Sequence, residues 1–380
     1  MGLFLRVGLL KVADATAGAL LCRVLARRYA LKEGEIPPVA PDPRNVRRVL
    51  VIRPGGMGDM LLLLPVISLL QKRFPGAAID IVCESRNIAV LRLVGLEGAA
   101  IPYDAHPVGL LWKLARTAYD VAVDSEQFHH FSAVFAVLSR APVRVGFKIN
   151  PLRNPLYTHL VNYAPDGAEG AQFMRLLEPL GIRAGDGPAA GILAGVGCSL
   201  PEAVERDLAR LAPSGAFVAI HPGARSRYKE WPAERFAQLA VSLHRLGSLV
   251  PVMVGDKRDK QVGDRILEAC REAGCPALSC QGRLDLAGTA SLIGRARLFV
   301  GTDSGLGHLA VAEGRPTVIL FGPSDALKWG LDDATHATVR AALPCAPCFI
   351  FGYHKPCRSV ACMRQITVEA VLAACRRVMG

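Results

Sequence analysis

The chain has 380 residues, of which 51% are hydrophobic and 21% are charged. This length and composition predict two globular domains and exclude a disordered protein, and no apolar run reaches the roughly 20 residues that a membrane-spanning helix needs. The net charge of +12 favours anionic partners such as nucleotide diphosphates, phosphorylated glycans and acidic lipid headgroups. Since the basic residues are scattered and no aromatic stacking motif accompanies them, we expect no nucleic-acid partner.

Residues 1–46 are expected to form an amphipathic helix and a linker. Lys11 and Asp14 interrupt the apolar run of residues 1–32, which disfavours a secretory signal peptide. Such a basic helix can lie in the headgroup region of an anionic membrane or pack on the protein's own surface, and the sequence leaves both open. Four prolines between Gly34 and Arg48 predict an extended linker. The apolar face of the helix comprises Phe4, Val12, Ala15, Ala19, Cys22, Ala26 and Ala30, with Arg6, Arg23, Arg27 and Arg28 away from it.

From residue 47 onward, short apolar runs alternate with helical stretches. This pattern predicts an α/β protein whose parallel sheets carry helices on both faces. The runs in the first half are 49–53, 78–83, 119–126 and 143–147, and those in the second are 216–223, 249–255, 297–305 and 316–322. We expect two doubly wound, Rossmann-like domains, 47–205 and 206–366, followed by a helix within 367–380. They should face a central cleft, with ligands at the carboxyl ends of the strands.

The first strand runs into the sequence RPGGMGDM. Gly55, Gly56 and Gly58 permit a tight turn, and the helix that follows offers unpaired N–H groups to an anion. Neither G-x-G-x-x-G nor G-x-x-x-x-G-K-[ST] is present, which disfavours dinucleotide and P-loop sites. Asp59 has two interpretations, a capping carboxylate at the helix N-terminus or a general base that accepts a proton from an acceptor hydroxyl.

Two segments of the second half predict a phosphate site. HPGARSRYKEWP (221–232) places Arg225, Arg227 and Lys229 between a strand and a helix, where they either face solvent or stabilise a diphosphate. In VGTDSGLGH (300–308), a strand leads into a turn and a helix whose N–H groups could bind phosphate. The residues of interest there are Asp303, Ser304, Gly305 and His308.

Eleven cysteines are unevenly distributed, and without a secretory signal they indicate a reducing, cytoplasmic setting. Four of them follow the spacing C-x2-C-x8-C-x4-C, which permits a structural Zn²⁺ site. The favoured interpretation is reduced thiols that stiffen a loop, with no metal, followed by zinc and then by disulfides. The four are Cys345, Cys348, Cys357 and Cys362.

The chain from Val49 to Val371 resembles glycosyltransferase family 9, the ADP-heptose:lipopolysaccharide heptosyltransferases. The paired elements G-D-x-x-x-x-x-P and D-[ST]-G-x-x-H-x-x-A, in this order, are specific together. The resemblance is carried by VLVIRPGGMGDMLLLLPVISLLQKRFPGAAIDIV, DSEQFHHFSAVFAVLSRAPVRVGF, HPGARSRYKEWPAERFAQLA and VGTDSGLGHLAVAEGRPTVILFGPSD.

This resemblance implies a GT-B fold and metal-independent sugar transfer with inversion, from a nucleotide-sugar donor and without a further cofactor. Asp59 would be the catalytic base, and Lys229 would contact the donor phosphate or sugar. Asp256 is the match to a further acidic contact with the donor sugar, and Asp303, Ser304, Gly305 and His308 would line the donor site. The last helix would pack back on the N-terminal domain.

The acceptor implied by the resemblance is a lipopolysaccharide core or a related, lipid-linked envelope glycan. The N-terminal helix suits a peripheral position at the cytoplasmic face of the inner membrane. Two alternatives stay open, a GT-B nucleotide-sugar epimerase or hydrolase and a non-catalytic glycan- or nucleotide-binding homologue. Turnover of the donor without acceptor would indicate the first alternative.

Overall fold

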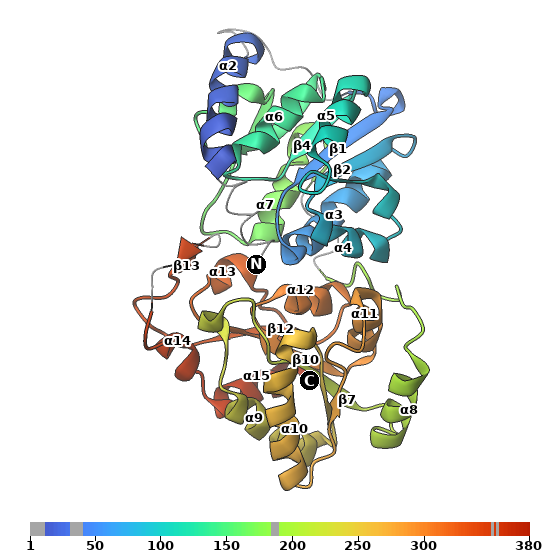
Figure 1. The fold of residues 1–380 in the computed structure, drawn as a ribbon, viewed down its shortest axis with the longest axis vertical. Coiled ribbons are helices and arrows are strands. Elements are labelled where there is room, and N and C mark those ends of the chain that lie inside the picture. Colours follow the sequence, from blue (N-terminus) through green and yellow to red (C-terminus); the bar gives the residue numbers. More distant parts are fainter. Residues whose placement is uncertain (1–11, 31–40, 184–189, 351–352, 355–356) are drawn as a thin grey trace. The chain divides into compact units, whose positions relative to one another are not determined.

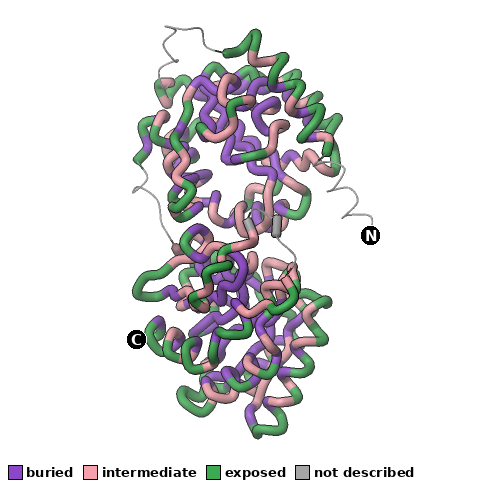
Figure 2. Tube along the Cα trace, turned by 90° about the vertical axis from the view of Figure 1, so that its left-hand side faces the viewer, coloured by how far each residue is buried: buried purple, intermediate pink, exposed green. Residues whose placement is uncertain are grey.

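The computed structural model describes residues 12–30, 41–183, 190–350, 353–354 and 357–380. They divide into two compact units, Met1–Pro188 and Ala189–Gly380. Each unit is a parallel six-stranded sheet with helices around it (Figure 1), and buried residues concentrate inside each unit (Figure 2). This confirms the α/β class and the two Rossmann-like sheets.

The division between the units falls before the expected boundary at residue 205. The segment after residue 189 belongs to unit 2 because it bonds to the end of a helix there. Gly191 N donates to Val311 O at 3.0 Å and Leu193 N donates to Ala312 O at 2.7 Å, and the Leu193 side chain is buried. A segment with few strand signals is thus fixed by its partners rather than by its own pattern.

The sheet of unit 1 has the strand order β3-β2-β1-β4-β5-β6, with all pairs parallel. This order reverses direction between β1 and β4, the position where doubly wound sheets bind ligands. The sequence pattern does not predict β3 and β6, which are short and only partly buried. The strands are β1 (Arg48–Arg53), β2 (Ala78–Cys83), β3 (Ala100–Pro102), β4 (Val121–Asp124), β5 (Val143–Lys148) and β6 (His159–Asn162).

Helices of unit 1 form two groups. One contains α6, which contacts β1, β4 and β5 and lies between α2 and α5, and the other contains α3, which contacts α4 and α7 (Figure 1). No helix among the described residues is both long and apolar enough to cross a membrane. The longer helices are α2 (Ala19–Tyr29), α3 (Met57–Arg73), α4 (Ile88–Leu93), α5 (Pro107–Arg116), α6 (His130–Leu138) and α7 (Glu169–Arg175).

The N-terminal helix is part of unit 1. A π-helical turn, η1 (Asp14–Gly18), leads directly into α2, and the carboxylate of Asp14 accepts hydrogen bonds from His130 N at 3.0 Å and Phe131 N at 2.8 Å. Asp14 therefore caps the start of α6, and Cys22 joins the core between α2 and α6.

The apolar face of this helix is only partly as predicted. Cys22 is buried and Ala19 and Ala26 are half-buried, but Val12, Ala15 and Ala30 are exposed, and Phe4 lies outside the described residues. The π-helical turn adds a residue to its hydrogen-bonded ring and so shifts the phase of the helix that follows. Leu20, Leu21 and Val24, which lie outside the predicted apolar face, are exposed.

Unit 2 repeats the topology of unit 1, with the strand order β12-β11-β10-β7-β8-β9. All strands of this sheet are parallel, and the strand order reverses between β7 and β10. The sequence pattern does not predict the two-residue β9, the edge strand β12 or the short hairpin β13–β14. The strands are β7 (Phe217–His221), β8 (Val250–Met253), β9 (Leu278–Ser279), β10 (Leu298–Thr302), β11 (Thr317–Phe321), β12 (His336–Arg340), β13 (Phe349–Ile350) and β14 (Tyr353–His354).

The C-terminal helix α15 packs on the sheet of unit 2. It contacts α9 and the strands β10 to β12, and Val371, Cys375 and Val378 enter the core of the unit. The Trp231 indole also donates to Ile366 O at 3.0 Å and fixes the chain just before α15. The helices are α8 (Glu202–Leu211), α9 (Ala233–Gly247), α10 (Lys260–Glu272), α11 (Leu286–Arg295), α12 (Gly305–Ala312), α13 (Ala326–Trp329), α14 (Ala361–Arg364) and α15 (Val368–Met379).

Candidate active site

The polar groups of unit 2 gather where β7 and β10 end. These strands are neighbours at the position where the sheet reverses its order, so the segments that follow them lie together. Lys229 lies in the short helix η8 (Arg227–Lys229) after β7, and Asp303 comes directly after β10. The Nζ of Lys229 donates to Oδ2 of Asp303 at 2.6 Å. Two residues 74 positions apart, both predicted for the donor site, are thus in direct contact.

Asp303 is buried, and Lys229 is not its only partner. Its Oδ2 also accepts a hydrogen bond from the Ser324 hydroxyl at 2.5 Å, at the end of β11. Burial acts to raise the pKa of this carboxyl, but the charge and hydrogen bond of Lys229, the Ser324 hydroxyl and the charge of His308 outweigh it and hold the pKa below its usual value. Asp303 therefore stays ionised and fixes the ammonium group of Lys229.

The next contacts involve the start of α12. Ser304 is the N-cap residue, and Gly305 and His308 lie in the first turn, where backbone N–H groups are not used by the helix itself. Ser304 Oγ is 3.0 Å from Nδ1 of His221, the last residue of β7. The other ring nitrogen of His221 is 3.4 Å from Oδ2 of Asp259. His221, Asp259 and Ser324 were not predicted as site residues, although each follows or ends a strand at this edge.

Asp256 and Arg225 are more peripheral. Asp256 caps the short helix η9 (Lys257–Asp259) after β8, and its exposed carboxylate pairs with Arg258. Its backbone N donates to Oδ2 of Asp259 at 3.0 Å, which connects this loop to His221. Arg225 is exposed in the loop after β7. Both residues keep their predicted place at the carboxyl edge of the sheet, outside the contact between Lys229 and Asp303.

In unit 1, Asp59 combines a cap with an ion pair. Its Oδ2 accepts from Gly56 N at 2.7 Å, which confirms the capping interpretation, and its Oδ1 is 2.9 Å from Nη2 of Arg53. Asp59 keeps 19% of its side-chain surface exposed, whereas Arg53 keeps 4%. A Cβ atom on Gly55 would come within 3.0 Å of this pair, so the glycine makes room for it. Gly58 lies in the first turn of α3.

Arg53 is a site residue that sequence analysis missed. It ends the otherwise apolar strand β1, and its Nη1 donates to Ser125 O at 2.7 Å while its guanidinium lies 4.8 Å from the centre of the Phe173 ring. Nearby Glu169 is completely buried and bonds to Gln127 and Tyr163. Burial raises the pKa of Glu169 to about 8, against the lowering effect of Arg53, and the charge of Asp59 adds to the rise. Arg53 could have been found from the sequence, because it is a charged residue at the end of an otherwise apolar strand.

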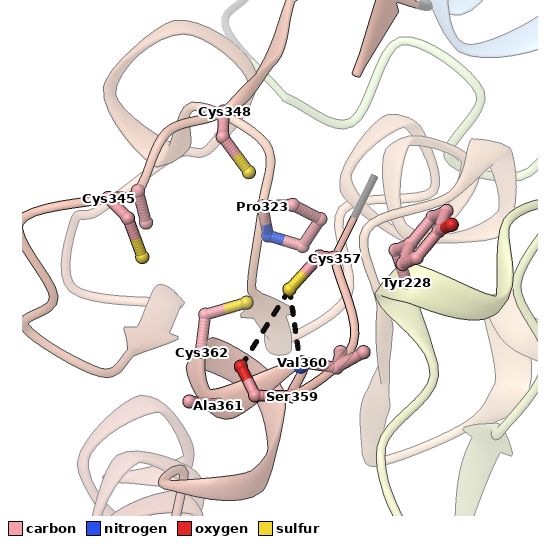
Figure 3. A pocket seen from close by; sticks show the side chains of 10 residues that line it. Tyr228, Pro323, Cys345, Cys348, Cys357, Ser359, Val360, Ala361 and Cys362 are labelled. Carbon is pink, nitrogen blue, oxygen red and sulfur yellow. Dashed lines mark hydrogen bonds between the residues drawn. The ribbon is translucent and has the colours of Figure 1, made fainter. Parts of the chain in front are cut away.

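The four predicted cysteines come together in unit 2. All of them line one cavity, with Tyr228, Pro323 and Val360 as neighbours (Figure 3), and none is in a disulfide. No three His, Cys, Asp or Glu side chains within the described parts of the chain are grouped closely enough to hold a metal ion. The cysteines are therefore neighbours whose sulfurs do not surround a common point. They are Cys345, Cys348, Cys357 and Cys362.

The site around Lys229 and Asp303 in unit 2 and the site around Asp59 in unit 1 differ in their chemistry. Unit 2 offers an anchored ammonium group and a helix N-terminus, which together suit an anionic group such as a diphosphate. Unit 1 offers a partly exposed carboxylate at the end of a strand, which suits proton transfer. A group transfer from a phosphorylated donor to a hydroxyl needs both functions.

Comparison with known proteins supports this chemistry. Residues 109–357 match the family model "Glycosyltransferase family 9 (heptosyltransferase)". Lipopolysaccharide heptosyltransferase 3 of Escherichia coli is 28% identical over 292 residues, which cover 72% of this chain and 82% of that protein. The structure of E. coli ADP-heptose LPS heptosyltransferase II matches with a TM-score of 0.63 at 24% identity, covering 87% of this chain and 98% of that one.

A third match shares the fold at lower sequence identity. The iron-containing dodecameric glycosyltransferase TibC from enterotoxigenic E. coli H10407 has a TM-score of 0.52 at 17% identity, covering 88% of this chain and 76% of that one. The family model alone spans about two thirds of the present sequence. The chain therefore belongs to glycosyltransferase family 9, and it is a glycosyltransferase with the GT-B fold.

Proposed function

We propose that this enzyme transfers heptose from ADP-heptose to a lipopolysaccharide core or a related envelope glycan, with inversion at the anomeric carbon and without a metal ion at the reacting atoms. Support comes from the family and from the named activity of the relatives in lipopolysaccharide synthesis. The observation that carries the proposal is the ion pair between Lys229 and Asp303 beside the N-terminus of α12.

The donor diphosphate would bind at this ion pair. As the sugar leaves, negative charge develops on the diphosphate, and the Lys229 ammonium group and the N–H groups of Gly305 and its neighbours would stabilise it. Asp303 keeps Lys229 in place, since it is buried and also held by Ser324. His308 lies in the same helical turn and would face the same anion, and Asp256 would contact the sugar from the loop after β8.

Asp59 would act on the acceptor. One carboxylate oxygen accepts the proton of the acceptor hydroxyl while the hydroxyl oxygen forms its bond to the anomeric carbon of the donor. The bond from that carbon to the diphosphate oxygen breaks, and ADP leaves with the electron pair. Attack from the face opposite to the leaving group inverts the configuration. Gly56 N and Arg53 orient the carboxylate throughout.

A panel of ADP-, GDP-, UDP- and dTDP-sugars tests the donor assignment, with binding measured by calorimetry without added metal. We expect binding of ADP-heptose alone, and preference for another nucleotide would overturn the assignment. Product analysis with a lipopolysaccharide core acceptor then tests transfer. Donor turnover in the absence of acceptor would instead identify an epimerase or hydrolase. If none of the nucleotide sugars binds, the protein would be a non-catalytic homologue.

We further propose that the enzyme lies on the cytoplasmic face of the inner membrane, where its lipid-linked acceptor is made. The support is an apolar, basic surface of unit 1. Leu20, Leu21 and Val24 are exposed on α2 next to three exposed arginines, and Trp112 is exposed on α5 with Arg116 stacked on its ring at 4.1 Å. Both helices border α6. Arginine next to exposed apolar side chains suits an anionic lipid surface.

A further inference from the structure

The serine that begins α12 does not cap it with its side chain. Ser304 occupies the N-cap position, where a serine hydroxyl ordinarily accepts a hydrogen bond from an N–H group of the first turn. Among the described residues of that turn, its hydroxyl makes no such bond. For comparison, Asp285 at the start of α11 accepts from Gly288 N at 2.8 Å. The hydroxyl of Ser304 is therefore directed to another partner.

That partner is His221, the last residue of β7. Nδ1 of its imidazole ring lies 3.0 Å from Ser304 Oγ, although the two residues are 83 positions apart in the sequence. His221 is 7% exposed, whereas Ser304 and the neighbouring Gly305 are half-buried. The serine is thus the more accessible member of the pair, and it lies at the start of the helix where the donor diphosphate is proposed to bind.

The opposite side of the ring is held by Asp259. Its Oδ2 lies 3.4 Å from Nε2 of His221 and accepts a hydrogen bond from Asp256 N at 3.0 Å. A Cβ atom on Gly223 or Gly255 would collide with this carboxylate, so two glycines make the space that it occupies. An ionised carboxylate only accepts hydrogen bonds, and it therefore keeps a proton on Nε2 and fixes the orientation of the ring.

The protonation state of the ring then decides where the Ser304 hydroxyl points. A hydroxyl has one proton to donate. In the neutral ring with its proton on Nε2, Nδ1 accepts a hydrogen bond from Ser304, and the O–H group is occupied. When both ring nitrogens are protonated, Nδ1 donates to Oγ, and the O–H group is able to turn to a ligand. Histidine ordinarily changes its charge between pH 5 and 8, so both states are accessible near neutral pH.

The charged groups that face the ring from the loop after β8 are carboxylates. Asp259 contacts the ring directly, and Asp256 acts on it from the same loop. A hydrogen bond from Arg258 holds the pKa of Asp256 below its usual value, and the charge of His221 contributes to the lowering. Both carboxylates favour the protonated ring, because an opposite charge nearby stabilises the charged form of a histidine.

On the side of α12, the ring contacts an uncharged group, the Ser304 hydroxyl. The ionised side chains at that edge of the sheet are Lys229 and Asp303, which form an ion pair with each other. His308 lies in the first turn of the same helix and is a second histidine that a bound anion would affect. A test of His221 must therefore separate its proton from that of His308.

We propose that His221 is a positioning residue of the donor site, which in its doubly protonated form turns the Ser304 hydroxyl toward the donor diphosphate, so that donor binding takes up a proton. The charge of the diphosphate stabilises the imidazolium, and the hydroxyl donates to a phosphate oxygen beside the N–H group of Gly305. The proton comes from solvent and returns to it when the nucleotide leaves. This role rests on the proposed function, because it requires a diphosphate at the start of α12.

Calorimetry of the wild-type enzyme measures the proton directly. Binding of ADP-heptose is followed at constant pH in buffers with different heats of ionisation, because a proton taken from the buffer changes the observed heat in proportion. We expect uptake of up to about one proton per donor between pH 6 and pH 8, and an affinity that falls by up to about tenfold per pH unit over this range. Binding with no proton uptake and with an affinity independent of pH would overturn the proposal.

Two variants assign the proton to this pair. Ser304→Ala removes the hydroxyl, so donor affinity at pH 6 should fall several-fold and proton uptake should largely disappear. His221→Asn keeps an N–H donor near the position of Nδ1 but cannot gain a proton, so donor affinity should persist and lose its dependence on pH. Proton uptake of wild-type size in either variant would assign the proton to another group, such as His308, and overturn the role of His221.

His244→Gln is the matched control. His244 is a half-buried histidine on α9, outside the site, and its Nδ1 lies 3.3 Å from Leu249 O. This variant should bind the donor with wild-type affinity and take up the same number of protons. Loss of uptake in this variant as well would show that the proton belongs to a general property of unit 2, and it would contradict the assignment to His221.

The identity of the nucleotide separates this inference from the proposed function. The inference concerns the diphosphate, which ADP-, GDP-, UDP- and dTDP-sugars share. Proton uptake with another nucleotide sugar would leave the role of His221 standing and overturn the proposed donor. Binding of ADP-heptose without proton uptake would overturn the role of His221 and leave the proposed donor standing. If none of the nucleotide sugars binds, both are overturned.

Discussion

The Nζ of Lys229 and Oδ2 of Asp303, which are 2.6 Å apart, join the segment after β7 to the segment after β10. The pair lies where the sheet of unit 2 reverses its strand order, so a small sequence change there affects both sides of the proposed donor site. Asp303 is 8% exposed and Lys229 is only partly buried, which leaves the ammonium group able to meet a ligand.

Replacement of Lys229 tests the donor site. Lys229→Ala removes a charged hydrogen-bond donor, so we expect ADP-heptose affinity to fall about 10- to 100-fold, the equivalent of about 1.5–3 kcal/mol. Calorimetry measures the loss. Lys260→Ala is the control, since Lys260 is an exposed lysine that pairs with Asp264 on α10 and its variant should bind donor normally. Unchanged affinity in Lys229→Ala would remove this residue from the donor site.

Replacement of Asp59 tests the proposed base. Asp59→Asn keeps the shape of the side chain but cannot accept the proton, and Asp59→Ala also removes the cap of α3. In both variants we expect donor binding to persist while transfer falls about 100-fold or more. A transfer assay with saturating donor measures it.

Asp285→Ala is the matched control for the loss of a cap in Asp59→Ala. Asp285 caps α11 through a hydrogen bond from Gly288 N at 2.8 Å, as Asp59 caps α3, but has no proposed role in catalysis. A similar loss of transfer in both alanine variants would assign the effect of Asp59→Ala to folding.

Glu169 predicts a dependence of stability on pH. Its pKa is raised to about 8 in the folded protein, so the folded state binds this proton more tightly than the unfolded state. The contribution of Glu169 to stability is therefore complete below about pH 4.5 and is lost as the pH rises through about 8, an effect on the order of a few kcal/mol. Denaturant unfolding from pH 5 to pH 9 should show this decline, and Glu169→Gln should flatten it. A parallel decline in the variant would exclude Glu169 as the cause.

The exposed side chains of α2 predict membrane binding. Replacement of Leu20, Leu21 and Val24 by Ser should reduce co-sedimentation with vesicles that contain anionic lipid, with little change in stability because these side chains are exposed. Trp112→Ser should act in the same direction. Wild-type enzyme that stays in the supernatant with anionic vesicles would contradict the prediction. Truncation near Arg44 is a less specific test, because it also removes the Asp14 cap and the buried Cys22.

The local sequence pattern predicts most of the strands and the sheet edges at which the site residues lie. The buried runs that form β1, β7 and β10 are continuous and apolar, and glycine or polar residues end them, so both the strands and their ligand-facing ends are visible in the sequence. The short strands β3 and β9 have no such run. Their existence depends on a neighbouring strand that offers hydrogen bonds, which no local pattern records.

The contacts made by side chains were harder to predict. Pairing of Asp59 with Arg53 depends on a tight turn that brings the end of β1 beside the first turn of α3. Glu169 is bonded by Gln127, which lies 42 residues earlier in the chain. The surface on which α15 packs could not be predicted from its sequence pattern either. Its apolar face fits any sheet surface, and the bond from Trp231 to Ile366 O, far apart in the chain, directs it to unit 2.

The cap that Asp14 provides for α6 has a thermodynamic consequence. Because α2 continues directly from the turn that carries Asp14, the docking of α2 and the stability of α6 are coupled. A lipid surface that binds α2 in its docked position must then raise the unfolding temperature of unit 1, by the same linkage through which any ligand stabilises the state it binds. Vesicles would act on this enzyme as a stabilising ligand, and the unfolding temperature of unit 1 would rise with lipid concentration.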